Sequence, residues 1–140
     1  MTVLRRWLVL SLLLSAAACS DSPATPTPTT SSGPYSQTDL VIGTGTAAAA
    51  TSQVTVSYTG WLYDTSKTDG KGLQFDSSPS ATFLLSGVIA GWQRGVPGMR
   101  VGGQRRLVIP PELAYGSAGR APSIPPNATL VFDIGLLGVQ

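Results

Sequence analysis

Residues 88–96 read Val88-Ile89-Ala90-Gly91-Trp92-Gln93-Arg94-Gly95-Val96, a short apolar segment that carries an indole. Val88, Trp92 and Val96 recur at four-residue spacing, which predicts one face of a helix over residues 88–96. Gly91 and Gly95 each cost about 1 kcal/mol relative to Ala in a helix, so packing against a larger element must hold it. We expect a sheet to wrap round this helix. Trp92 then forms either the floor of an apolar pocket or an ordinary part of the core.

The segments on both sides of this helix have the patterns of strands. Residues 54–60 (VTVSYTG) alternate apolar and polar side chains, as a half-buried strand does. Four other short runs are predicted as strands: residues 39–42, 82–85, 104–109 and 129–137. Residues 64–74 predict a surface loop or irregular hairpin, and residues 114–127 a long loop. Several strands around one short helix indicate an α+β domain with a mainly antiparallel sheet.

The composition narrows the chemistry that the chain can perform. Its 140 residues suggest one folded domain, and nine Lys and Arg stand against seven Asp and Glu. Without Arg5 and Arg6 the charges from residue 20 onward balance, which argues against binding to nucleic acid. The sequence has no His and one Cys, Cys19. We therefore expect neither a nucleophile activated by His nor a His-ligated metal, and no cofactor.

Residues 1–34 are expected to serve export and to lie outside the folded domain. Residues 1–19 have the order of an export signal, with Arg5 and Arg6, then an apolar run over residues 7–14, then small residues. Residues 14–19 resemble a bacterial lipobox, which implies lipidation of Cys19 and a membrane anchor. An ordinary secretory signal cut near Ala18 is the alternative. Residues 20–34 contain twelve Ser, Thr or Pro residues and are expected to be a linker.

The remaining residues, 35–140, resemble the FKBP-type peptidyl-prolyl isomerases. The resemblance rests on five segments in the family's order: residues 54–60, 75–78 (FDSS), 88–92, 114–116 (AYG) and 124–132 (IPPNATLVF). It implies a twisted antiparallel sheet of about five strands curled round one short helix. That architecture agrees with the interpretation of the strand and helix patterns.

The resemblance also implies a site. Positions of catalytic residues in the family are matched by Tyr58, Phe75, Asp76, Trp92, Tyr115 and Phe132, and positions that bind substrate by Ala81, Val88, Ile89 and Ile124. In this picture Trp92 is the floor and Phe75 and Phe132 are walls. The Ile89 N–H and the Tyr115 hydroxyl bond substrate carbonyls, and the Tyr58 hydroxyl holds a buried Asp76.

Each of these residues also has a purely structural interpretation. Phe75 and Phe132 can be core, Asp76 can cap a turn with Ser77, and Tyr115 can anchor its loop. Asp133 and the pair Arg105-Arg106 are expected to face solvent.

The sequence departs from the family pattern at a few places. Ala81 stands where relatives commonly carry an aromatic residue, and the Ser86-Gly87 turn is short. Arg120 and Ser123 are also unlike the family's usual residues.

The implied function is rotation about Xaa-Pro bonds in exported or unfolded proteins, in an apolar pocket and without covalent chemistry. The implied small ligands are macrolides such as FK506 and rapamycin, and a monomer is expected. A binding or chaperone module with the same fold but no turnover is the alternative.

Overall fold

The computed structural model describes residues 33–140. The predicted export signal, the predicted lipidation site Cys19 and most of the predicted linker lie outside the described residues. Within them, five strands, one α-helix and two 3-10 turns follow in the order β1 (Ser36–Val41), β2 (Gln53–Tyr63), β3 (Lys71–Leu84), η1 (Leu85–Gly87), α1 (Ala90–Gly95), β4 (Gln104–Ile109), η2 (Pro111–Leu113) and β5 (Leu130–Val139). This five-stranded antiparallel sheet with one short helix confirms the predicted α+β class.

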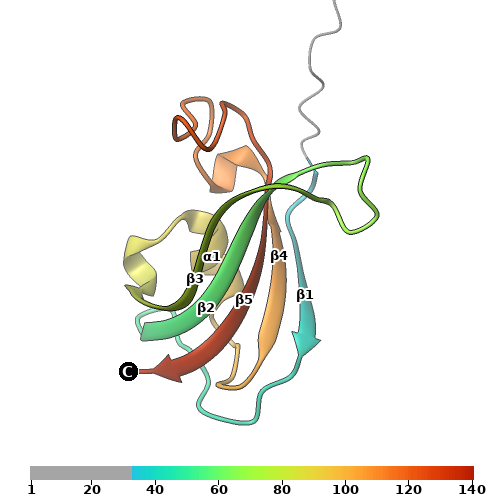
Figure 1. Cartoon of the computed structure of the whole chain (residues 1–140). Helices are drawn as coiled ribbons and strands as arrows, with labels where there is room; N and C mark the ends of the chain where they lie inside the picture. The colour runs from blue at the N-terminus through green and yellow to red at the C-terminus, as the bar shows by residue number, and fades with distance from the viewer. Residues whose placement is uncertain (1–32) are drawn as a thin grey trace, which may run out of the picture.

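The strands form a single sheet in the order β1-β4-β5-β2-β3, and every pairing is antiparallel. Figure 1 shows α1 and η1 on one face of this twisted sheet, with the loop between β4 and β5 at one end of that same face. Side chains alternate between the two faces of a strand. Phe132, Ile134 and Leu136 of β5 therefore turn toward the helix and are buried, whereas Asp133 lies on the opposite face.

Strand β3 is much longer than residues 82–85, where the sequence predicted a strand. It runs for 14 residues at the edge of the sheet, and its register against β2 shifts at three places. Such bulges and the proline at Pro79 are features of edge strands, and they interrupt the alternation by which a strand is recognised in a sequence. The 71–74 part of the predicted loop is therefore strand.

Helix α1 is shorter than the predicted 88–96 span, because Ile89 keeps an extended backbone with φ −56° and ψ 150°. The helix packs closely on β4 through its two glycines. A Cβ at Gly91 would overlap the side chain of Ile109, and one at Gly95 would lie 2.5 Å from Cδ2 of Leu107. The glycines that weaken the isolated helix thus allow it to approach the sheet and bury Trp92, Val96 and Gly95.

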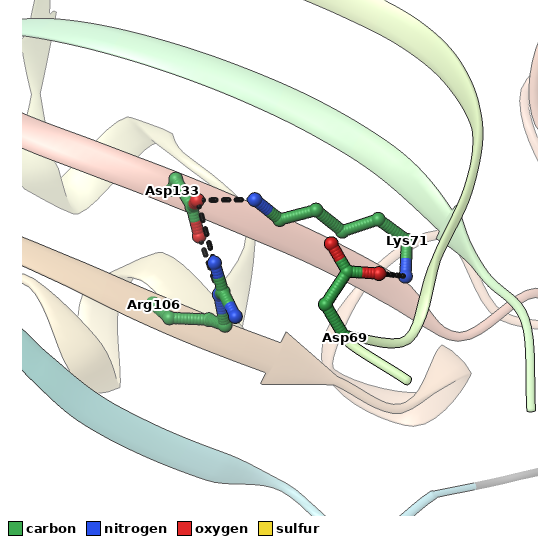
Figure 2. Close-up of polar contacts among 4 residues, drawn as sticks. All are labelled: Asp69, Lys71, Arg106 and Asp133. Atoms are coloured by element: carbon green, nitrogen blue, oxygen red, sulfur yellow. Dashed lines mark hydrogen bonds and ion pairs between the residues drawn. The ribbon is translucent and has the colours of Figure 1, made fainter. Parts of the chain in front are cut away.

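The expectation that Arg105 faces solvent is wrong, whereas Arg106 and Asp133 lie on the face opposite the helix and are about a quarter exposed. Arg105 is 9% exposed, and it donates to the Asp39 carboxylate and to the Gly95 carbonyl at 2.5 and 2.7 Å. Arg106 and Asp133 are direct cross-strand partners, with Nε–Oδ1 and Nη2–Oδ2 distances of 2.7 and 2.9 Å. Figure 2 shows the Lys71 ammonium reaching the same carboxylate from β3, at 2.7 Å. A charge pattern within one strand does not reveal partners that a neighbouring strand supplies.

Candidate active site

A cavity of about 670 Å³ opens on the helix-bearing face of the sheet. Strands β2, β3 and β5 form one side of it, and the η1–α1 segment and the loop between β4 and β5 form the others. Its lining is mostly aromatic and aliphatic, and the residues are Tyr58, Phe75, Asp76, Phe83, Gly87, Val88, Ile89, Trp92, Tyr115, Arg120, Ala121, Pro122, Ser123, Ile124 and Phe132.

Trp92 lies at the centre of the aromatic lining. Its ring meets Tyr58, Phe83 and Phe132 edge to face, at centroid distances of 5.4, 5.7 and 5.4 Å. These are the geometries that aromatic pairs prefer. The indole is 4% exposed, and its Nε1–H has no hydrogen-bond partner among residues 33–140. Trp92 therefore belongs to the core and also lines the cavity.

Phe75 and Phe132 form a perpendicular pair at 5.5 Å on the sheet side of the cavity. Both rings lie over Gly60 of β2, where a Cβ would come within 2.7 Å of each ring. Gly60 is the direct cross-strand partner of Phe132 and of Asp76, so the missing side chain leaves the space that the two rings occupy. The position of this glycine thus determines how deeply the wall residues sit.

Tyr58 and Asp76 form the polar edge of the cavity. The Tyr58 hydroxyl donates to Oδ2 of Asp76 at 2.8 Å, and the Ser77 N–H donates to Oδ1 at 2.9 Å. Burial, followed by the hydrogen bond to Asp76 and the charge of Asp76, raises the pKa of Tyr58 to about 12. The hydroxyl therefore stays protonated and remains a donor at neutral pH.

Asp76 was expected to be buried, and it is exposed. The reason is its place on β3, which has no neighbour on its outer side. The tyrosine hydroxyl and the Ser77 amide fix the orientation of the carboxylate without shielding it from water.

Two groups at the cavity can donate hydrogen bonds to a bound peptide. The Ile89 carbonyl accepts from the Trp92 and Gln93 amides at 3.0 and 3.1 Å, whereas the Ile89 N–H makes no hydrogen bond within the described chain. The Tyr115 hydroxyl accepts a long bond of 3.4 Å from Nη1 of Arg120, which leaves its own proton free to be donated. Val88 and the buried Ile124 add apolar surface near these donors.

The cavity brings together all but one of the site residues named from the sequence. The exception is Ala81, which is not among the lining residues. Ala81 lies two residues from Phe83 on β3 and so shares its face, but its side chain is a single methyl group. Phe83 lines the cavity instead and was not named from the sequence, although it stands within the predicted strand 82–85. The next two residues, Leu84 and Leu85, are also apolar, so the sequence did not show which side chain of this segment would face the helix.

Clusters of His, Cys, Asp or Glu side chains that could hold a metal ion do not occur among residues 33–140. What the arrangement offers is an apolar, ring-lined surface with a few hydrogen-bond donors at its edge. Such a surface can take up an apolar ring and remove it from water.

Comparison with known proteins identifies the family. The family model described as FKBP-type peptidyl-prolyl cis-trans isomerase matches residues 44–137. The chain belongs to this family. The matched residues run from the segment after β1 into β5 and include the whole lining of the FKBP-type cavity.

Individual relatives agree with this membership. The chain is 48% identical over 103 residues to FK506-binding protein 4 of Dictyostelium discoideum, and 43% identical over 107 residues to an FK506-binding protein of Neisseria meningitidis. These alignments cover 71% and 72% of this chain. The chain spans 26% of the length of the Dictyostelium relative and 92% of the Neisseria relative.

A solved structure shows the same FKBP-type fold. The crystal structure of a peptidyl-prolyl cis-trans isomerase from Pseudomonas syringae matches with a TM-score of 0.66 at 39% identity, over 76% of this chain and 75% of the other. Membership of the family, the sheet and the helix thus rest on independent comparisons of sequence and structure.

Proposed function

We propose that residues 35–140 form a peptidyl-prolyl cis-trans isomerase domain that acts on proline-containing segments of unfolded or exported proteins. The observation that carries the proposal is the cavity floored by Trp92 and walled by Phe75 and Phe132, in a chain of this family. The cavity is open to solvent and Trp92 is one of its lining residues, so a proline ring that enters the cavity would lie near the indole.

The chemistry needs no reactive group. The barrier to rotation about the C–N bond is about 18–20 kcal/mol, because resonance gives that bond double-bond character. Twisting the bond returns the lone pair to nitrogen and reduces the dipole of the amide. A dry aromatic surface therefore disfavours the planar, dipolar ground state more than the twisted state. The Ile89 N–H and the Tyr115 hydroxyl would hold the flanking carbonyls while the proline turns.

The test is magnetisation exchange between the cis and trans signals of a short Xaa-Pro peptide, with and without the protein. We expect Trp92→Leu to lower the exchange rate at least about tenfold, since a misplaced binding surface can cost up to a hundredfold. Trp61→Leu is the matched control. Trp61 lies under the Lys71 ammonium, 4.1 Å from it, and is not a lining residue. If the folded parent protein gives no acceleration, the proposal is wrong.

FK506 and rapamycin are proposed as inhibitors that occupy the same cavity. Rapamycin added to the exchange assay should suppress the acceleration in proportion to its occupancy. Acceleration that persists at saturating rapamycin, with binding verified by calorimetry, would place the activity elsewhere in the protein.

The second candidate is a binding module without turnover. The observation that favours it is that Ala81 does not line the cavity. The cavity therefore lacks an aromatic side chain at a position where relatives commonly have one. Slow exchange in the parent protein, together with suppression of the aggregation of an unfolded client, would favour this candidate.

We also propose that the protein is exported as a monomer and anchored through a lipid on Cys19, with residues 20–34 as spacer. The supporting pattern is the leader and lipobox-like sequence. Within residues 33–140 there is no helix long and apolar enough to cross a bilayer. Radioactive palmitate should label the parent protein and not a Cys19→Ala variant. Label retained by that variant would contradict the anchor.

A further inference from the structure

The lining of the cavity includes a cation, Arg120, that forms no ion pair within residues 33–140. Of the residues that line the cavity, Asp76 and Arg120 are the two that bear a charge. The Asp76 carboxylate already accepts hydrogen bonds from the Tyr58 hydroxyl and the Ser77 amide. Arg120 forms no ion pair with Asp76 or with any other carboxylate in residues 33–140, whereas Arg105 and Arg106 both do.

The backbone of Arg120 is held firmly at this place. Its N–H donates to the Ile124 carbonyl at 2.8 Å, and the Ile124 N–H donates back at 2.9 Å. Ile124 is 3% exposed and belongs to the core, and Gly119 donates to the Tyr115 carbonyl at 3.1 Å. The loop therefore presents Arg120 at the cavity as a consequence of its own packing.

The guanidinium lies against the group proposed to bind the peptide carbonyl. Nη1 of Arg120 is 3.4 Å from the Tyr115 hydroxyl, and the guanidinium carbon is 5.8 Å from the centre of the Tyr115 ring. Its field reaches the opposite wall as well. Burial and Asp76 raise the pKa of Tyr58 to about 12, and Arg120 acts in the opposite direction. An anion that enters beside Tyr115 would meet a cation that has no carboxylate partner within residues 33–140.

We propose that Arg120 is a specificity-determining residue that favours peptides with Asp or Glu immediately before or after the proline. This inference rests on the proposed function of the cavity and names the substrates that it prefers. Guanidinium groups bind carboxylates through two parallel N–H donors, and five donors are available on Arg120. A Lys side chain in the same place would be repelled.

The test compares blocked peptides Ac-Ala-Xaa-Pro-Phe-NH2 and Ac-Ala-Ala-Pro-Xaa-NH2 with Xaa as Glu, Gln or Lys. Neutral ends leave Xaa as the only charge. For the parent protein we expect kcat/KM from exchange spectroscopy to favour Glu over Lys by about two- to fivefold in at least one series, as for an exposed ion pair. Arg120→Gln should bring this ratio close to one, and Arg120→Glu should invert it. The preference should shrink in 0.5 M salt, where the screening length is a few ångströms.

Arg100→Gln is the matched control, because it removes the same charge from an exposed arginine outside the cavity. It should keep the Glu-to-Lys ratio of the parent. A ratio in the parent that Arg120→Gln leaves unchanged would overturn the inference, and so would a parent that prefers Lys. Peptide dissociation constants from calorimetry separate the two proposals. If the parent accelerates no peptide but still binds Glu peptides more tightly through Arg120, the isomerase fails and the role of Arg120 stands.

Discussion

At the scale of single residues, the shape of the cavity wall depends on the absence of a Cβ atom at residue 60. Gly60 has no side chain at the point where Phe75 and Phe132 meet, and a Cβ there would lie 2.7 Å from a carbon of each ring. Real Cβ atoms do not approach other carbons so closely, so both rings would have to move. Gly60 thus positions the wall without itself touching a substrate.

We therefore expect Gly60→Ala to lower kcat/KM for an Xaa-Pro peptide by about tenfold or more, since small misplacements of a binding surface are costly. Overpacking should also lower the free energy of unfolding by about 1–3 kcal/mol. The measurements are exchange spectroscopy and urea unfolding. Gly138→Ala is the control, because a Cβ at Gly138 meets Thr55 at an ordinary 3.7 Å. Equal activities of the two variants would contradict this account of the wall.

At the scale of elements, two small residues on α1 allow the helix to pack closely on β4. Gly91 and Gly95 face Ile109 and Leu107, which are fully buried. The helix has six residues, too few to be stable alone, so contact with β4 must supply its stability. This contact also sets the height of Trp92 beneath the cavity.

Gly91→Ala should consequently destabilise the protein although Ala is the better helix former. The gain of about 1 kcal/mol in helix propensity is smaller than the cost of about 1–3 kcal/mol for overpacking against Ile109. Thermal unfolding measures the balance. Gly87→Ala has open space around its Cβ and should leave the melting temperature nearly unchanged. A stabilised Gly91→Ala variant would show that the helix can move away from β4 at little cost.

On the opposite face of the sheet, three strands are joined by one carboxylate. The Asp133 carboxylate of β5 accepts hydrogen bonds from the Arg106 side chain of β4 and from the Lys71 ammonium of β3. The backbone N–H of Lys71 donates separately to the Asp69 carboxylate (Figure 2). Burial alone would raise the pKa of Asp133, but the hydrogen bonds from Arg106 and Lys71 outweigh it and lower the pKa. A lowered pKa means that the ionised carboxylate stabilises the fold at neutral pH.

The sign of the pH dependence follows from that shift. The stability from Asp133 is complete above the unfolded value of about 3.9 and is lost as the pH falls through the lower folded value. Asp133→Asn should therefore cost about 1–2 kcal/mol at pH 7 and much less at pH 2. Urea unfolding across this range is the measurement. Asp69→Asn is the matched control, because it removes a neighbouring carboxylate and keeps an acceptor for the Lys71 amide. A constant difference between parent and Asp133→Asn would refute the assignment.

At the scale of the whole molecule, the described residues contain everything that the cavity needs. The lining residues lie between Tyr58 and Phe132, and the buried core runs from Ala48 to Leu136. The long strand β3, the helix α1 that packs on β4 and the 114–127 loop all lie within residues 33–140.

A protein that begins at residue 33 should therefore fold and should keep the kcat/KM of the full chain for a short peptide, within about twofold, since sites without shared partners behave independently. The comparison needs exchange spectroscopy and thermal unfolding of both forms. A loss of stability or activity greater than this would mean that residues 1–32 contribute to the domain.

The sequence by itself determined the fold class and the presence of a helix around Trp92. Its resemblance to the FKBP-type family implied ten site residues, of which nine line the cavity. The sequence could do so because strand alternation, helical spacing and the five ordered segments are local patterns along the chain. The tertiary structure alone decided the rest. It placed Phe83 rather than Ala81 in the lining, left Asp76 exposed on an edge strand, and paired Arg106 with Asp133. These outcomes depend on which residue lies opposite on a neighbouring strand, and register shifts and strand order set that relation across the sheet.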